Sequence, residues 1–161
     1  DGEIDWLHSE PNPTQSDYGY RQFISNIDAL LMGRKSFEKV MSFEQWPYDK
    51  PVFVATSTLT EIPRELNGKV QLVSGTPQEM VALVHSLGFK SLYIDGGQLI
   101  QSFLANDMIS ELIITKIPIL LGDGIPLFGK LTDALRFEHK ETIVYDNALV
   151  KTHYLRKGTD A

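Results

Sequence analysis

The sequence contains no cysteine, and this absence removes several kinds of chemistry. Without thiols the chain forms no disulfide, carries no thiolate nucleophile, and holds neither an iron–sulfur cluster nor a cysteine-ligated zinc ion. Such a chain fits the reducing conditions of the cytoplasm, which is the location we expect. The four histidines are scattered without the spacing of metal ligands, so we predict no metal site.

Positive charge and long hydrophobic runs are also scarce. The chain has 15 lysine and arginine residues against 21 aspartate and glutamate residues, for a formal net charge of −6. No stretch gathers the bases into the stripe that a phosphate backbone requires, so we expect no nucleic-acid partner. The apolar run 112–121 is interrupted by Lys116 and Pro118 and is far shorter than the ~20 residues that span a bilayer. We therefore expect a soluble protein with no membrane segment.

The length and composition fit one globular domain. The chain has 161 residues, of which 42% are hydrophobic, enough for one sizeable core. No internal repeat or long linker marks a boundary, so we predict a single domain over residues 1–161. The sequence begins at Asp1 with neither an initiator methionine nor a signal-like region, and we expect that a segment precedes it.

Short apolar runs alternate with stretches of helical periodicity along most of the chain. The sequence predicts strands over 29–32, 52–55, 70–73 and 91–94. It predicts helices over 17–26, after Gly33, from Pro77 and over 98–104. Strands that alternate with helices of about ten residues indicate an α/β fold with a largely parallel sheet.

The last third of the sequence has a different pattern. Residues 111–121 form a long apolar stretch, and residues 122–129 form a turn-rich loop. Residues 142–145 are then expected to pair with residues 149–155 across an Asp146-Asn147 turn. We expect this antiparallel hairpin to close one edge of the sheet.

Two strand-to-helix junctions carry glycine: Gly33 in LLMGRKS and the Gly96-Gly97 pair in YIDGGQ. In open α/β sheets, ligands bind at the carboxyl ends of strands, where backbone N–H groups and the positive end of a helix face an anion. Glycine lets the backbone approach that anion because no Cβ intervenes. Together the junctions predict a grip on an extended phosphorylated ligand, whereas either one alone is equally well explained as a tight turn.

The residues around the first junction sharpen this hypothesis. The chain has neither G-x-G-x-x-G nor G-x-x-x-x-G-K-[ST], so it carries no standard nucleotide fingerprint. Arg34 and Lys35 follow Gly33 at a helix N-terminus, where the helix macrodipole disfavours cations. An anion bound among them would explain two consecutive bases. The alternative is a solvated surface pair.

Four blocks of the sequence together resemble a known family. They are DALLMGRKSFE (28–38), VFVATST (52–58), LYIDGGQLIQSFL (92–104) and ISELIITKIPILLGDGIPLF (109–128). Their order and spacing are similar to the dihydrofolate reductase fold, and most similar to its branch with the C-terminal reductase domain of the bifunctional riboflavin-biosynthesis protein. The resemblance implies a three-layer α/β fold with a central, mostly parallel sheet, an antiparallel C-terminal hairpin and helices on both faces.

The resemblance also implies that the ligand at the glycine junctions is NADPH. It assigns the cofactor's phosphates to the helix opened by Gly33, Arg34, Lys35 and Ser36. In this scheme Arg34 lies near the adenosine 2′-phosphate. Thr56 and Ser57, at the end of the VFVA strand, would contact the same phosphate and the ribose.

The second junction has a matching role by resemblance. Gly96 and Gly97, often joined by a cis peptide in this fold, would lie against the pyrophosphate, and Gln98 and Leu99 would supply helix N-terminal amides. Many family members have a third glycine where this chain has Asp95. A carboxylate there would repel the pyrophosphate unless it points away. The family's first strand also has no counterpart here, which is a further reason to expect a missing N-terminal segment.

Reduction of a C=N bond by a nicotinamide needs a hydride and a proton source. Dihydrofolate reductases use a carboxylate in the helix before the strand that leads to the GR turn. Counting back from Gly33 without a gap, Asp17 falls at that position, which makes it the candidate catalytic acid. The alternative is an N-cap, worth about 1 kcal/mol of stability.

The resemblance implies an NADPH-dependent reductase of a pterin- or pyrimidine-type small molecule, similar to 5-amino-6-(5-phosphoribosylamino)uracil reductase. The PILLGDGIPLF block favours this branch over dihydrofolate reductase, which is an alternative. No H-x-E followed by P-C-x-x-C is present, so the zinc site of the deaminase partner is absent from the sequence. Further alternatives are an NADP-binding protein without turnover and a structural domain that binds nothing. The branch pairs along a sheet edge, which implies a homodimer.

Overall fold

The computed structural model describes residues 11–12 and 15–158 of the chain. Its contacts form two compact units, and each is described by itself. One is the continuous stretch Asp17–Asn106, and the other combines the residues from Asp107 onward with the segment before Asp17. The prediction that residues 1–161 make a single domain stays a prediction.

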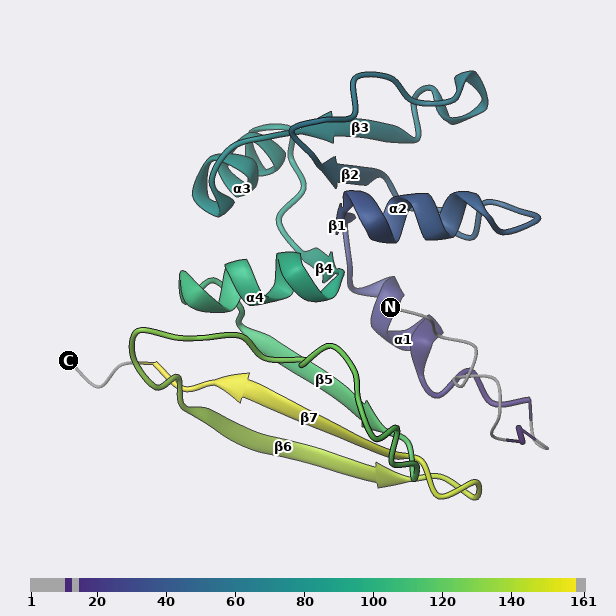
Figure 1. The fold of residues 1–161 in the computed structure, drawn as a ribbon, viewed down its shortest axis with the longest axis vertical. Helices are drawn as coiled ribbons and strands as arrows, with labels where there is room; N and C mark the ends of the chain where they lie inside the picture. Colours follow the sequence, from purple (N-terminus) through teal and green to yellow (C-terminus); the bar gives the residue numbers. More distant parts are fainter. Residues whose placement is uncertain (1–10, 13–14, 159–161) are drawn as a thin grey trace. The chain divides into compact units, whose positions relative to one another are not determined.

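The first unit is built on a four-stranded parallel sheet (Figure 1). Its strands are β1 (Ala29–Gly33), β2 (Val52–Ala55), β3 (Val70–Val73) and β4 (Leu92–Asp95), in the order β3-β2-β1-β4. β1 pairs with both β2 and β4, so that Leu31 lies between Phe53 and Ile94. The predicted α/β class is confirmed, and each of these predicted strands is found to within about one residue.

Strand β1 lies in the interior of this sheet and is buried along its length. Leu30, Leu31 and Met32 have 0% exposed surface. An uninterrupted apolar run is what a parallel strand needs when both faces of its sheet are covered. Burial of each such side chain stabilises the fold by about 1.5–3 kcal/mol. The carboxyl end of β1 is therefore firmly held, and so is the junction that follows it.

Four α-helices accompany the parallel sheet. They are α1 (Tyr20–Ser25), α2 (Arg34–Met41), α3 (Pro77–Ser86) and α4 (Gly97–Ala105), and a short 3-10 helix, η2, covers Arg64–Leu66. Helix α2 packs Phe37 into the core cluster that contains Leu30 and Met32. Helix α4 buries Phe103 and Leu104.

Helix α1 is shorter than the sequence predicts. The prediction began at Asp17, but the helix begins at Tyr20. The two residues between them, Tyr18 and Gly19, have φ angles of 52° and 82°. A right-handed helix excludes positive φ, so these residues form a turn that leads into the helix.

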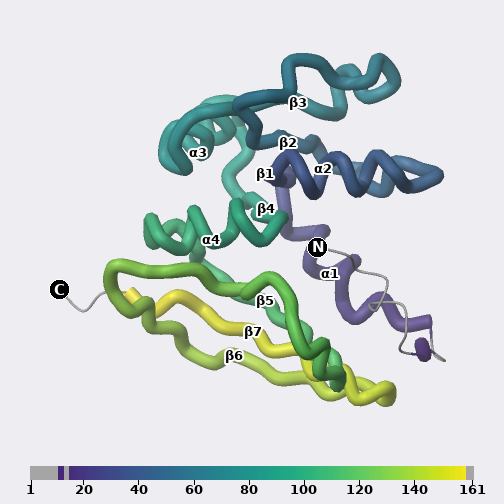
Figure 2. Tube along the Cα trace, viewed as in Figure 1, coloured from purple at the N-terminus to yellow at the C-terminus, as the bar shows by residue number. Residues whose placement is uncertain are grey.

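The second unit contains a three-stranded antiparallel sheet. Its strands are β5 (Glu111–Lys116), β6 (Phe137–Val144) and β7 (Val150–Arg156), in the order β5-β7-β6. The tube trace runs from β6 into β7 through a turn in which the N–H of Ala148 donates to the Tyr145 carbonyl (Figure 2). The predicted hairpin and its Asp146-Asn147 turn are therefore confirmed.

Two details of this unit differ from the prediction. The described pairings join β7 to β5 and β6, and none joins the hairpin to the parallel sheet, so its expected place at an edge of that sheet is not found. The predicted apolar stretch 111–121 forms a strand only as far as Lys116. Pro118 follows closely, and proline has no N–H to continue a ladder.

Hydrogen bonds from the side chains of Arg156 and Asn147 join segments at the two ends of this unit. Arg156 donates from Nε and Nη2 to the two carboxylate oxygens of Asp107, at 2.6 and 2.8 Å. Its Nη1 also donates to the Arg136 and Lys157 carbonyls. At the other end, Asn147 Nδ2 donates to the Pro11 carbonyl at 3.0 Å.

Within the described ranges, no helix is long and apolar enough to cross a membrane.

Candidate functional site

The two glycine junctions lie side by side at the carboxyl ends of β1 and β4 (Figure 1). Met32 pairs with Asp95 across these strands, so Gly33 and Gly96 follow at neighbouring positions. Helix α2 begins directly after Gly33, and helix α4 begins directly after Gly96. The sequence identified the two junctions separately, and the sheet topology brings them to one place.

Close contacts join the two junctions. An added Cβ on Gly96 would lie 2.6 Å from the Ser36 Oγ and 3.6 Å from the backbone nitrogen of Gly33. An added Cβ on Gly33 would lie 3.9 Å from the Cβ of Leu99. Nothing lies within 4 Å of the corresponding position on Gly97. Glycine at position 96 therefore serves the packing of α2 against the second junction, while the backbone at Gly97 is open on that side.

The turn from β4 into α4 depends on the conformation of Gly96. Its φ angle is 99°, in the region that favours glycine. The described residues contain no cis peptide bond, so the cis bond expected between Gly96 and Gly97 is wrong for this structure. The positive φ of Gly96 redirects the chain instead.

The helix starts at this place have no side-chain caps. Gly33 and Gly96 are the N-cap residues of α2 and α4, neither helix start has a side-chain cap hydrogen bond, and neither first turn contains an acidic residue. Gln98 and Leu99 lie in the first turn of α4. The backbone N–H groups of these turns have no partner within their own helix and suit an anion.

Helix α3 shows the contrasting arrangement. The N–H of Glu79 donates to the Thr76 Oγ1, and the Thr76 N–H donates back to the Glu79 carboxylate at 2.7 Å. This capping box satisfies its first N–H groups and adds negative charge to the first turn. Of these three helices, α2 and α4 are suited to an anion and α3 is not.

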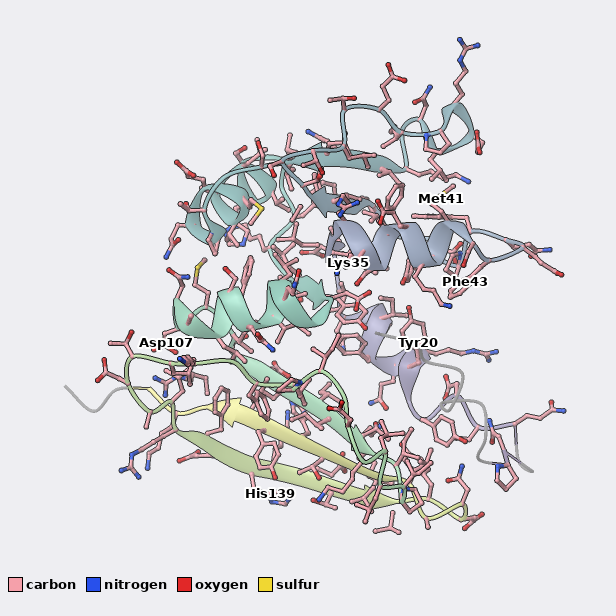
Figure 3. The ribbon with its side chains drawn as sticks, in the orientation of Figure 1. Tyr20, Lys35, Met41, Phe43, Asp107 and His139 are labelled. Carbon is pink, nitrogen blue, oxygen red and sulfur yellow. The ribbon has the colours of Figure 1, made fainter. Side chains whose placement is uncertain are left out.

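The first turn of α2 carries the two bases that the sequence analysis noted. Lys35 is exposed at the start of the helix (Figure 3). Arg34 donates from Nη1 to the Glu38 Oε1 at 2.6 Å, with side chains that are 42% and 49% exposed. The sequence analysis missed this ion pair, although the spacing of four residues between a base and an acid is a signal for it.

Thr56 and Ser57 follow β2 at the same edge of the sheet. Gly33 at the end of β1 pairs with Ala55 at the end of β2, so Thr56 lies just beyond the carboxyl end of β2. The Thr56 Oγ1 accepts hydrogen bonds from the N–H groups of Thr58 and Leu59, at 3.2 and 3.0 Å. In this role the hydroxyl is an acceptor, and its own hydrogen can still be donated to a ligand. Ser57 is exposed.

Asp17 has the contacts of a capping residue. Its Oδ1 accepts from the Gly19 N–H and its Oδ2 from the Arg21 N–H, each at 3.0 Å. These backbone bonds, chiefly that from Arg21, hold the pKa of the carboxyl below its usual value. A lowered pKa keeps the group ionised at neutral pH, which does not suit a proton donor. The N-cap residue of α1 is Gly19, so Asp17 is not the N-cap itself, although its carboxylate satisfies the Arg21 N–H of the first turn. A catalytic role for Asp17 stays a prediction.

Asp95 has the opposite electrostatic environment. It ends β4, it is partly buried, and burial raises its pKa despite a hydrogen bond from the Gly96 backbone. Tyr20, Tyr48 and Tyr93 also have raised pKa values, first because of burial and next because of the charge of Asp95. The pKa of Tyr48 reaches about 12. The four groups are therefore close enough to sense one another's charge.

Two of these tyrosines contact further aromatic rings. Phe23 meets Tyr93 edge-on with ring centroids 5.0 Å apart, and Trp46 meets Tyr48 at 5.4 Å. Trp46 also contacts Phe37 of α2, and it packs against the core cluster that includes residues of β1 and β2. Its Nε1 is buried without a hydrogen-bond partner among the described residues. Trp46 is thus a packing residue, and Tyr20 on α1 is the more exposed ring (Figure 3).

Comparison with known proteins identifies the family. The family model described as the RibD C-terminal domain matches residues 1–151. The chain belongs to this family. Two relatives in this comparison, both from Bacillus subtilis strain 168, are named as uncharacterized proteins. YwjB is 33% identical, covering 97% of this chain and 88% of its own, and YyaP is 26% identical, covering 98% and 86%.

Solved structures agree with membership of the RibD C-terminal domain family. A crystal structure from Shewanella sp. PV-4, named provisionally as a riboflavin biosynthesis protein, is 46% identical with a TM-score of 0.92. The alignment covers 98% of this chain and 89% of that one. The deaminase/reductase from Thermotoga maritima is 8% identical with a TM-score of 0.72, covering 97% of this chain and 51% of that one. At that identity the likeness shows the fold alone.

Membership of the RibD C-terminal domain family confirms the resemblance on which the sequence analysis relied. The roles assigned to individual residues, from Gly33 to Leu99, stay predictions. The described residues contain no group of three or more histidine, aspartate or glutamate side chains arranged to hold a metal. The sequence analysis treated Asp95 only as an obstacle to a phosphate and did not predict the raised pKa of its carboxyl. An acid that ends an otherwise apolar strand was the signal.

Proposed function

We propose that this protein is an NADPH-dependent reductase of a pterin- or pyrimidine-type small molecule, of the same class as 5-amino-6-(5-phosphoribosylamino)uracil reductase. Membership of the RibD C-terminal domain family supports reductase chemistry. The observation that carries the proposal is the pair of uncapped helix starts after Gly33 and Gly96, which touch each other at adjacent strand ends. This arrangement suits a ligand with several linked phosphates.

The residues present fit a dinucleotide with an extra phosphate. The N–H groups at Gly97, Gln98 and Leu99 would hold the pyrophosphate, and the open backbone at Gly97 permits close approach. Arg34 and Lys35 would face the 2′-phosphate, with Ser36 completing that helix turn. Thr56 and Ser57 would donate hydroxyl hydrogens to the same phosphate or its ribose. When bound, NADPH would supply a hydride from its nicotinamide ring.

The proton for such a reduction needs a separate source. Among the described carboxyl groups with a shifted pKa, Asp95 is the one whose pKa is raised, and it lies at the carboxyl end of the sheet. We propose that Asp95, rather than Asp17, holds the proton that the substrate receives. The nearby rings of Tyr20 and Tyr48 fit a flat heterocyclic substrate, which stacks on aromatic side chains.

Thermal unfolding with added cofactor tests the cofactor part of the proposal. At 100 times its dissociation constant, a ligand adds about 2.7 kcal/mol of stability, which moves the midpoint of a chain of this size by roughly 5–10 °C. We expect this shift with NADPH and a smaller one with NADH. Arg34→Gln should reduce the NADPH shift, whereas the control Arg64→Gln, in η2, should leave it unchanged. Equal shifts with both cofactors, or none, would contradict the proposal.

Turnover then separates the substrate classes. NADPH oxidation is followed with dihydrofolate, with a simple dihydropterin and with the phosphoribosylamino-pyrimidine. Turnover of the pyrimidine alone supports the riboflavin-type reaction, and turnover of dihydrofolate supports the first alternative. Binding of NADPH with no oxidation in the presence of any of them would favour a cofactor-binding protein without turnover.

A further inference from the structure

The base that opens α2 is engaged by an acid of its own helix. Arg34 is the first residue of α2, and Glu38 lies one turn further along. Their Nη1 and Oε1 atoms are 2.6 Å apart, and both side chains are about half exposed. The helix sequence RKSFEKVM contains no other acid, so Glu38 is the carboxylate that α2 offers to its first turn.

Helix stability does not explain this pair. A helix favours acids near its N-terminus and bases near its C-terminus, and the pair runs in the opposite direction. Exposed ion pairs of this kind contribute little to folding. The first turn is also where an anionic ligand would meet Arg34, because Gly33 and its neighbours leave the backbone N–H groups uncapped.

We propose that Glu38 sets the cofactor preference of this site by competing with the cofactor's 2′-phosphate for Arg34. The inference rests on the proposed function, because it takes NADPH as the ligand. A phosphate with a charge of nearly −2 must share the guanidinium with the carboxylate, and the two anions repel each other. NADH carries a neutral hydroxyl at the same position, so Glu38 does not oppose it. The carboxylate thereby reduces the difference in binding affinity between NADPH and NADH.

The size of the effect follows from simple electrostatics. Two anions on opposite sides of one guanidinium lie about 7 Å apart, and in high dielectric their repulsion weakens NADPH binding about threefold to fivefold at low salt. At physiological ionic strength the Debye length is about 8 Å, so roughly a twofold effect remains. The effect on binding requires the 2′-phosphate and weakens as the salt concentration rises, and these two properties distinguish it from a structural effect.

The test compares two charge-matched variants of the whole chain. Glu38→Gln removes the competing charge, and the control Glu44→Gln removes an exposed carboxylate beyond the end of α2. Calorimetric titration measures the dissociation constants for NADPH and NADH at 20 mM and 500 mM NaCl, and thermal unfolding without cofactor verifies that each variant folds. We expect Glu38→Gln to bind NADPH about threefold more tightly at low salt, with NADH unchanged.

Each outcome has one meaning. Tighter NADPH binding by Glu38→Gln alone, diminishing with salt, supports the inference. Unchanged or weaker NADPH binding by this variant, or an equal change for NADH, overturns it, since Glu38 would then be neutral or would orient Arg34. If the wild-type protein itself binds no NADPH, the proposed function fails first and the inference fails with it.

Discussion

The substitution Gly96→Ala tests the geometry that joins the two glycine junctions. Gly96 has φ 99° and ψ 126°, a conformation that costs a residue with a side chain about 1–3 kcal/mol. The new Cβ would also lie 2.6 Å from the Ser36 Oγ, where an ordinary contact begins at 3.4 Å. Repacking to relieve this contact adds about 1 kcal/mol. The unfolding free energy should therefore fall by about 2–4 kcal/mol.

Thermal and urea unfolding measure this loss. For a chain of this length the midpoint temperature should fall by roughly 5–15 °C. In a Ser36→Ala background the hydroxyl contact is gone and the remaining Ser36 Cβ is 3.7 Å away. Gly96→Ala should then cost about 1 kcal/mol less, with only the backbone strain left.

Gly97→Ala is the matched control. Gly97 is the first residue of α4, and an added Cβ would have no neighbouring atom within 4 Å. The free energy of unfolding of the variant should therefore change by no more than about 0.5 kcal/mol. The same change should weaken NADPH binding, because the Cβ would stand between the backbone and a phosphate. Equal stabilities for Gly96→Ala and Gly97→Ala would refute the argument from φ and Ser36.

Four further predictions concern individual side chains. Asp95→Asn should lower the rate of NADPH oxidation by about 10²-fold or more, whereas Asp17→Asn should keep the rate within about twofold; steady-state kinetics of the two variants across pH decide between them. Because burial raises the pKa of Asp95, its ionisation opposes folding, so wild-type stability should decline as pH rises through that pKa and Asp95→Asn should lack this decline in urea unfolding. The Arg156 hydrogen bond lowers the pKa of Asp107 below 3.8, so its contribution is full above that pH and is lost as pH falls through the lowered value. The stability difference between wild type and Asp107→Asn should accordingly vanish in acid, and a difference that persists there would contradict the assignment. Thr76→Ala should cost about 1 kcal/mol by removing the cap of α3, as measured by urea unfolding.

The sequence predicted the parallel sheet well because its two inner strands, β1 and β2, are buried along most of their length. In β1 and β2 every position within the sheet must be apolar, so the runs 29–32 and 52–55 stand out against their surroundings. The glycine junctions were visible for the same reason, since glycine interrupts each apolar pattern abruptly. To predict a ligand site where the junctions meet, only the rule that ligands bind at the carboxyl ends of such strands was needed.

Other features are set by contacts that a linear pattern does not contain. Strand β6 starts at Phe137 and runs through charged residues with mostly exposed side chains, so its extent depends on pairing with β7. Helix α1 loses its first turn to the positive φ of Tyr18, which helical spacing does not reveal. The raised pKa of Asp95 follows from its burial in the folded chain, and its charge acts on Tyr20 and Tyr48, which are far away in sequence.

The division of the chain has a consequence for its synthesis. Every residue of the candidate site belongs to the uninterrupted stretch Asp17–Asn106, so a ribosome synthesises all of them before it makes the first residue of β5. Local, contiguous stretches of this kind tend to fold early during translation. The segment around Pro11 is made before them, yet its partner Asn147 comes near the end of the chain. Pro11 is thus synthesised long before the residue with which it forms this hydrogen bond.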